Sequence, residues 1–172
     1  GGDLKVAGVV KPGEHIGLFE VVPLPGHTFG QVGFYVEGVL YAGDALFGEK
    51  VLEKYDVPYF MDVDAFLESL ERIRSLDPEI LVIGRGPVAG SRRRVVELIE
   101  VNRASVERAV RPVESALPRD VTAIAVRLVK EVAAERGWEN VLLTMTTVRA
   151  VLSKLAKEGR VYIDENGLWK RN

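Results

Sequence analysis

Short strand patterns separated by tight turns fill the first 42 residues of this chain. Each of four runs is rich in Val, Leu, Ile or aromatic side chains, which favour strands. These runs cover residues 4–10, 15–24, 31–36 and 39–42. Turn-forming pairs such as Pro25-Gly26 and Glu37-Gly38 separate them. Because connections this short join antiparallel neighbours, the pattern predicts a mostly antiparallel sheet.

Two of these strand patterns end in side chains that can bind a metal ion. His27 follows the second run in Pro25-Gly26-His27-Thr28, and Asp44 follows the fourth run after Gly43. The ends of adjacent strands lie at one edge of the sheet, and the side chains there point into a shared opening, which is called the mouth below. We therefore expect His27 and Asp44 to lie close together. A zinc site needs at least three protein ligands, and these two residues supply only part of that set. The chain has no Cys, and its other histidine, His15, is interpreted as structural.

A third strand end is expected at the same mouth. A helix is predicted to begin after Asp62, a good N-cap residue, and to stop at Asp77-Pro78. The apolar run 80–83 then predicts a buried strand that leads into Gly84-Arg85-Gly86-Pro87. Arg85 cannot bind a metal ion, because a guanidinium group stays protonated and has no free lone pair.

Two interpretations of Arg85 are open. Its charge can pair with Asp44 and take the place of a metal ion's charge, in which case Arg85→Met destabilises the fold noticeably. Alternatively, Arg85 points to solvent from a Gly-rich loop. His27 is likewise either a metal ligand or a hydrogen-bonded loop histidine.

The sequence changes character after about residue 100. Residues 1–100 hold ten Lys and Arg against sixteen Asp and Glu, whereas residues 101–172 hold thirteen against nine. Long helical patterns replace the strands, which indicates a second structural unit. Helices are predicted over residues 91–110 and 121–136, and Gly137 ends the second of them. A further helix is predicted over 148–158. It follows Thr144–Thr147 and ends before Gly159.

A hairpin signal closes the sequence. Strand patterns at 161–163 and 168–170 flank Asn166-Gly167, a strong two-residue turn. Two helices followed by a hairpin match the order of a winged helix, a fold that often binds nucleic acid. Basic residues fall opposite the apolar stripe or near the hairpin and could neutralise phosphates: Arg149, Lys157, Arg160 and Lys170. A small unit that packs on the sheet explains the same residues.

Three segments together resemble the C-terminal half of the metallo-β-lactamase superfamily. They cover residues 25–28, 40–44 and 83–88. The resemblance implies that His27 is a metal ligand, and that Asp44 bridges or orients two metal ions and is catalytic. Arg85 stands where the family usually has its last histidine, and the family's His-x-His-x-Asp-His motif would precede residue 1.

The resemblance implies an α+β fold that is half of an αβ/βα sandwich. Three units are expected: the sandwich half over 1–90, a helical linker over 91–117 and a winged-helix-like domain over 118–172. The last unit is similar to the small C-terminal domain of a branch with hydroxyacylglutathione-hydrolase-like and endoribonuclease-like proteins.

The implied function is the C-terminal portion of a zinc hydrolase of the thioester or phosphodiester class, inactive as this chain alone. Zinc would bind only if an N-terminal half supplied the remaining ligands. The alternative is a metal-free binding protein, or a nucleic-acid-binding protein that uses the winged-helix-like domain.

Half of a sandwich exposes the apolar face of its sheet, so a partner is expected to cover it. The candidates are a separate N-terminal half and a second copy of the chain. No apolar run is long enough for a membrane span and no secretion signal opens the sequence, which predicts a cytoplasmic protein. Gln occurs once and Asn four times, a bias typical of proteins from hot environments.

Overall fold

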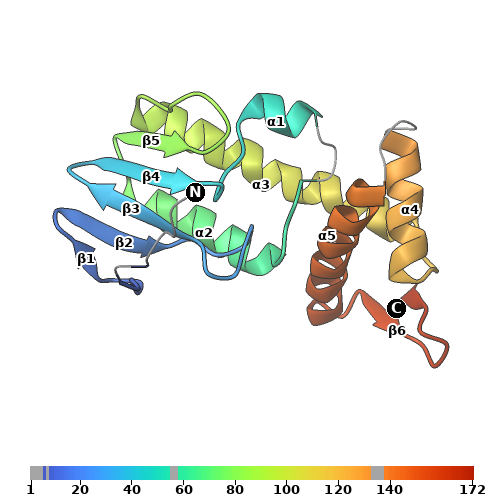
Figure 1. The fold of residues 1–172 in the computed structure, drawn as a ribbon. Coiled ribbons are helices and arrows are strands. Elements are labelled where there is room, and N and C mark those ends of the chain that lie inside the picture. Colours follow the sequence, from blue (N-terminus) through green and yellow to red (C-terminus); the bar gives the residue numbers. More distant parts are fainter. Residues whose placement is uncertain (1–5, 7, 55–57, 133–137) are drawn as a thin grey trace, which may run out of the picture.

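The computed structural model describes residue 6 and residues 8–54, 58–132 and 138–172. Its first half contains one five-stranded sheet in the order β1-β2-β3-β4-β5 (Figure 1). Pairings from β1 to β4 are antiparallel, and β4 pairs with β5 in parallel. The prediction of a mostly antiparallel sheet is therefore confirmed. The strands are β1 (His15–Ile16), β2 (Phe19–Pro23), β3 (Val32–Val36), β4 (Val39–Gly43) and β5 (Ile80–Ile83).

Two strand predictions were wrong in detail. The run 15–24 is a hairpin of β1 and β2 and not one strand, because Gly17 turns the chain at a φ of 60°. The run 4–10 forms no strand at its described positions, Val6 and residues 8–10, and its other residues lie outside the described part.

Helices α2 (Val63–Leu76) and α3 (Arg92–Ser115) lie along one face of the sheet (Figure 1). As predicted, Asp62 caps α2, because its carboxylate accepts a hydrogen bond of 3.0 Å from the Ala65 amide. Asp77 ends α2 in the left-handed conformation, at a φ of 46°. The sheet and the helices bury Leu24, Leu40, Leu81, Phe66, Leu70 and Ile73 completely.

Helix α3 extends beyond its predicted end near residue 110. It begins after the N-cap Ser91 and continues through Pro112 to Ser115. Proline removes one backbone hydrogen bond from the helix, but burial of Val110 and Val113 holds the last turn against the core. A short helix, α1 (Glu49–Lys54), lies between β4 and α2.

The C-terminal part consists of α4 (Val121–Val132), α5 (Trp138–Lys157) and a hairpin of β6 (Val161–Ile163) and β7 (Trp169–Arg171). The predicted helix over 121–136 is described as far as Val132, and its predicted stop at Gly137 lies outside the described residues. Residues 144–147 were expected before the next helix but lie inside α5. Threonine is tolerated there because Thr146 bonds back to the Leu142 carbonyl and Thr147 bonds to another segment.

The predicted turns around the hairpin are confirmed. Gly159 and Gly167 have φ values of 70° and 77°, which favour glycine. An isolated antiparallel bridge also joins Arg119 to Trp169, so β7 has a second extended neighbour beside β6. Buried residues of the sheet, of α2 and α3, and of α4 and α5 form one continuous apolar cluster. Among the described helices, none is both long and apolar enough to cross a membrane.

Candidate functional site

His27 follows β2 in a loop that is fixed against the start of α2. The Gly26 carbonyl accepts hydrogen bonds from the amides of Met61 and Asp62, at 2.9 and 3.1 Å. A Cβ atom at Gly26 would lie 2.4 Å from the Phe66 Cα atom, and Gly26 has a φ of 133°. Both facts require glycine immediately before His27.

The His27 ring is held on two sides by aromatic rings. Its centroid lies 5.6 Å from that of Phe47 and 5.1 Å from that of Tyr59, both edge to face. Its Nδ1 atom is 3.2 Å from the Tyr59 carbonyl oxygen. A carbonyl can only accept a hydrogen bond, so this contact favours a proton on Nδ1 and leaves the Nε2 lone pair free to bind a metal ion.

Asp44 and Arg85 lie at the same mouth. The Asp44 Oδ2 atom is 3.8 Å from His27 Nε2 and 3.6 Å from Arg85 Nη2. The side chain of Asp44 is 28% exposed and that of Arg85 is 63% exposed. The structure therefore brings together the three residues that follow β2, β4 and β5, with Arg85 at ion-pair distance from Asp44.

Gly84 sets the approach of β5 to Asp44. Its amide donates a 2.7 Å hydrogen bond to the Gly43 carbonyl. A Cβ atom on Gly84 would lie 2.6 Å from Asp44 Oδ1, so any larger residue would displace the carboxylate. The glycine beside Arg85 thus has a packing role at the site.

The donors at this mouth do not by themselves fit a metal ion. His27 Nε2 and the Asp44 carboxylate are suitable ligand atoms for zinc, but their third neighbour, Arg85, is a cation. Within the described ranges, no group of three or more His, Asp or Glu side chains is placed to hold a metal ion. His15 lies on β1 at the edge of the sheet, exposed and opposite Glu20, and is not part of the site.

Two polar residues near the site were not predicted from the sequence. Asn102 on α3 and Thr147 on α5 have 0% and 1% exposure, and both bond to loop backbone near His27. In the sequence they are polar residues within largely apolar helical stripes. That pattern does not distinguish them from ordinary helix residues.

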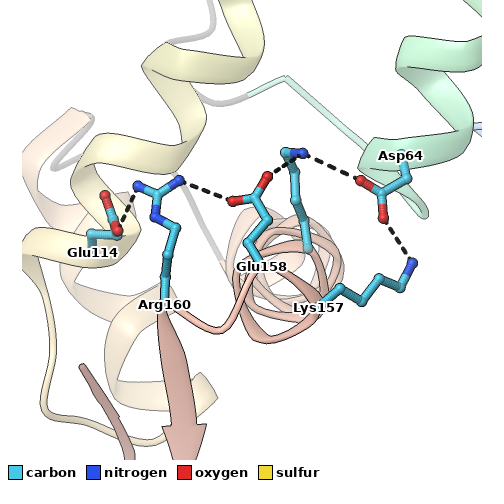
Figure 2. Close-up of polar contacts among 6 residues, drawn as sticks. Asp64, Glu114, Lys157, Glu158 and Arg160 are labelled. Atoms are coloured by element: carbon cyan, nitrogen blue, oxygen red, sulfur yellow. Dashed lines mark hydrogen bonds and ion pairs between the residues drawn. The ribbon is translucent and has the colours of Figure 1, made fainter. Parts of the chain in front are cut away.

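The basic residues predicted for nucleic-acid binding lie mostly in ion pairs within the chain. Figure 2 shows Lys157 beside Asp64, at 2.7 Å, and Arg160 between Glu114 and Glu158, at 2.7 and 3.0 Å. The Asp64 carboxylate raises the pKa of Lys157. These carboxylates offset the positive charge that a phosphate backbone would require.

The other two predicted residues differ from one another. Lys170 pairs with Asp164 at 2.7 Å, and the Asp164 carboxylate raises the pKa of Lys170. Arg149 is exposed on α5. Three of the four predicted cations are therefore already paired.

Comparisons with known proteins agree with the fold. Residues 1–85 match the family described as the Metallo-beta-lactamase superfamily. A Beta-lactamase-like protein 2 homolog of Caenorhabditis elegans is 26% identical over 144 residues, which cover 83% of this chain and 46% of the relative.

Two solved structures resemble most of the chain. A metallo-beta-lactamase family protein of Thermus thermophilus matches with a TM-score of 0.67 and 26% identity, over 95% of this chain and 54% of that protein. A beta-lactamase domain protein of Burkholderia ambifaria matches in fold with a TM-score of 0.69 and 19% identity, over 95% and 52%. The chain spans about half the length of these relatives. It therefore has an α+β fold that matches about half of such a protein, and its residues 1–85 match the model of the metallo-beta-lactamase superfamily.

Proposed function

We propose that this chain contributes the His27 and Asp44 ligands to the centre of a metal-dependent hydrolase of the thioester or phosphodiester class. The observation that supports the proposal is the meeting of His27 Nε2 and Asp44 Oδ2, 3.8 Å apart, at the ends of β2 and β4. A metal ion bound there would activate a water molecule for attack on the substrate. The remaining ligands would come from residues other than the described ones.

Each residue has a separate role in this proposal. His27 offers its Nε2 atom, and the contact of Nδ1 with the Tyr59 carbonyl fixes the orientation of the ring. Asp44 offers a partly exposed carboxylate. Arg85 contributes a fixed positive charge beside Asp44, so these residues serve one metal position and not two. The chain alone is expected to be inactive.

Metal analysis of the native protein tests the proposal. The protein is purified from its source with each variant introduced, its mass is measured, and its zinc content is determined by elemental analysis. We expect one zinc per chain, a loss of that zinc in His27→Ala, and no loss in the control His15→Ala. Arg85→His should raise the content toward two. An unchanged zinc content in His27→Ala, or a protein without zinc, would contradict the proposal.

The C-terminal part is proposed to be winged-helix-like, as in the hydroxyacylglutathione-hydrolase-like and endoribonuclease-like branch. The order α4, α5 and the β6–β7 hairpin supports this assignment, as does the bridge between Arg119 and Trp169. In this structure the basic end of α5 is turned toward α2 through the Lys157–Asp64 pair. The primary role proposed for this part is therefore to pack against the sheet unit, that is, the sheet β1–β5 with α2 and α3.

A second candidate function is that of a metal-free binding protein. The exposed guanidinium of Arg85 favours it, because its N–H groups beyond the Asp44 contact can bind an anionic group at the mouth. Titration with inorganic phosphate in the absence of metal separates the two candidates. Saturable binding that disappears in Arg85→Met and persists in His27→Ala favours the second.

We also propose a partner for the sheet face opposite α2 and α3. Phe19, Phe34 and Tyr41 form an aromatic cluster there, with ring centroids 6.5 and 6.2 Å from that of Phe19. Tyr41 is 44% exposed. The complementary half of the sandwich or a second copy of this chain would bury the cluster.

A further inference from the structure

The aromatic rings that flank His27 belong to loop residues whose backbones are held by buried polar side chains. On one side, Asn102 of α3 holds Phe47: the Phe47 amide donates to Asn102 Oδ1, and Asn102 Nδ2 donates to the Phe47 carbonyl, both at 2.8 Å. Asn102 is completely buried. This side of the His27 pocket is therefore fixed by α3.

Thr147 of α5 holds the other side of the pocket. The Phe60 amide donates to Thr147 Oγ1 at 3.1 Å, and Thr147 Oγ1 donates to the Pro58 carbonyl at 3.0 Å. Tyr59 lies between these two residues, and its own carbonyl faces His27 Nδ1 at 3.2 Å. One hydroxyl from the C-terminal part of the chain thus fixes both neighbours of the residue that orients His27.

Packing alone does not explain a threonine at this position. The apolar face of α5 is already formed by Val148, Val151 and Leu155, all fully buried. A valine of similar shape would fill the space at residue 147 without burying a hydroxyl. A buried hydroxyl is costly unless it is hydrogen-bonded, and Thr147 uses its hydroxyl as both donor and acceptor toward the loop.

We infer that Thr147 is a positioning residue for His27, which couples α5 to the proposed metal ligand. Through Pro58 and Phe60 it holds the Tyr59 carbonyl against Nδ1. That contact keeps the imidazole in the tautomer with a proton on Nδ1 and a free lone pair on Nε2, facing Asp44. The importance of this tautomer for hydrolysis rests on the proposed function, but the tautomer itself is a property of the metal-free protein.

Nitrogen NMR of the imidazole rings tests the inference directly. The chain has only two histidines, so ¹⁵N-histidine labelling gives two ring systems, and His15→Gln assigns the signals of His27. The measurement is made without metal, at a pH at which only neutral imidazole is populated. We expect wild-type His27 to show a protonated Nδ1 and an unprotonated Nε2, and exposed His15 to show the tautomer mixture of free histidine.

Variants of two neighbouring threonines separate positioning from packing. Thr147→Val removes the buried hydroxyl, and we expect the Nδ1-protonated fraction of His27 to fall toward that of free histidine. Thr147→Ser keeps the hydroxyl and should keep the wild-type signals. Thr146→Val is the matched control, because the Thr146 hydroxyl donates a hydrogen bond within α5, to the Leu142 carbonyl. It should leave His27 unchanged.

Several results would overturn the inference. One is an Nε2-protonated His27 in the wild type, and another is a Thr147→Val variant with wild-type His27 signals. If Thr147→Val does not fold, the His27 signals of wild type and of Thr147→Ser are compared. Thr147→Ser signals far from those of wild type would contradict a role for the hydroxyl, and Thr147→Ser signals equal to those of wild type would support it. Failure of the proposed function alone would instead appear as missing zinc with the His27 tautomer intact.

Discussion

Lys157 Nζ lies 2.7 Å from Asp64 Oδ2, so the last turn of α5 is joined to the first turn of α2. Lys154 approaches the other oxygen of Asp64 at 3.4 Å and also pairs with Glu158. Asp64 is therefore the carboxylate through which α5 is held to the sheet unit. The same helix carries Thr147 to the loop beside His27, so this pairing bears on the site as well as on stability.

Asp64→Asn should lower stability in a pH-dependent way. The hydrogen bond from Lys157, and a weaker one from Lys154, lower the pKa of Asp64 below its ordinary value. A carboxyl with a lowered folded pKa contributes stability above its unfolded pKa, near pH 4, and loses it as the pH falls through the folded value. We expect Asp64→Asn to cost about 1 kcal/mol or less at neutral pH and nothing at about pH 2.

Urea unfolding of wild type and variant at both pH values measures this difference. Glu53→Gln, on α1, is the control and should show no comparable pH-dependent loss. High salt should also reduce the cost of Asp64→Asn. A cost that is equal at both pH values would show that the charge of Asp64 is not what stabilises the contact.

Gly26→Ala should be severely destabilising, whereas Gly30→Ala in the same loop should be nearly neutral. A methyl group at residue 26 would clash with backbone and Cβ atoms of Phe66 and would require a strained φ, whereas residue 30 has open space. We expect a loss above about 2 kcal/mol for Gly26→Ala in the free energy of unfolding, measured by urea denaturation. Equal stability of the two variants would contradict the packing argument.

Much of the sheet unit could be predicted from the sequence, because its signals are local. Helix α2 begins after its N-cap Asp62 and ends at Asp77 in a left-handed turn. Strands β3 and β4 follow a strand pattern that is interrupted by a turn at Gly38. The hairpin of β1 and β2 was missed because Gly17 lies inside an otherwise continuous strand pattern. Helix α5 begins earlier than predicted because tertiary contacts of Thr147 outweigh the weak helix propensity of threonine.

The candidate site could be predicted only in part. His27, Asp44 and Arg85 follow strand patterns, and sheet topology alone brings strand ends together. Asn102 and Thr147 could not be predicted, because their partners lie 55 to 89 positions away along the chain. Their roles depend on which loop the folded helices meet, and no local pattern encodes that.

Gly84→Ala should disturb Asp44 without unfolding the chain. The added methyl group would meet the end of the Asp44 side chain, which can rotate away, and not a fixed backbone atom at that distance. We expect loss of the contacts of Asp44 with His27 and Arg85 and a free-energy cost of about 1 kcal/mol. Gly90→Ala is the control, because nothing lies within 4 Å of its added methyl group. A crystal structure with an unmoved Asp44 would refute the prediction.

Arg85→Met should change the melting temperature less than the sequence-based expectation of a noticeable loss. At 63% exposure and 3.6 Å, the Arg85–Asp44 contact is a solvated ion pair, and such pairs contribute little. We expect a shift within about 2 °C by scanning calorimetry. A larger drop would indicate that Arg85 satisfies a charge that the remaining site cannot solvate.

Tyr41→Lys should weaken association through the exposed sheet face. Tyr41 lies opposite Phe34 in the sheet and contacts Phe19, so a charge at residue 41 would be placed beside the other two rings of the aromatic cluster. If a second copy covers this face, light scattering should give about twice the mass of one chain for the wild type and the mass of one chain for the variant. Val96→Lys on α3 removes an exposed apolar side chain elsewhere and should not change the mass.

A wild-type protein that stays monomeric at high concentration would eliminate the second copy, leaving the complementary half of the sandwich as the proposed partner. Binding of that half should then be lost in Tyr41→Lys and kept in Val96→Lys.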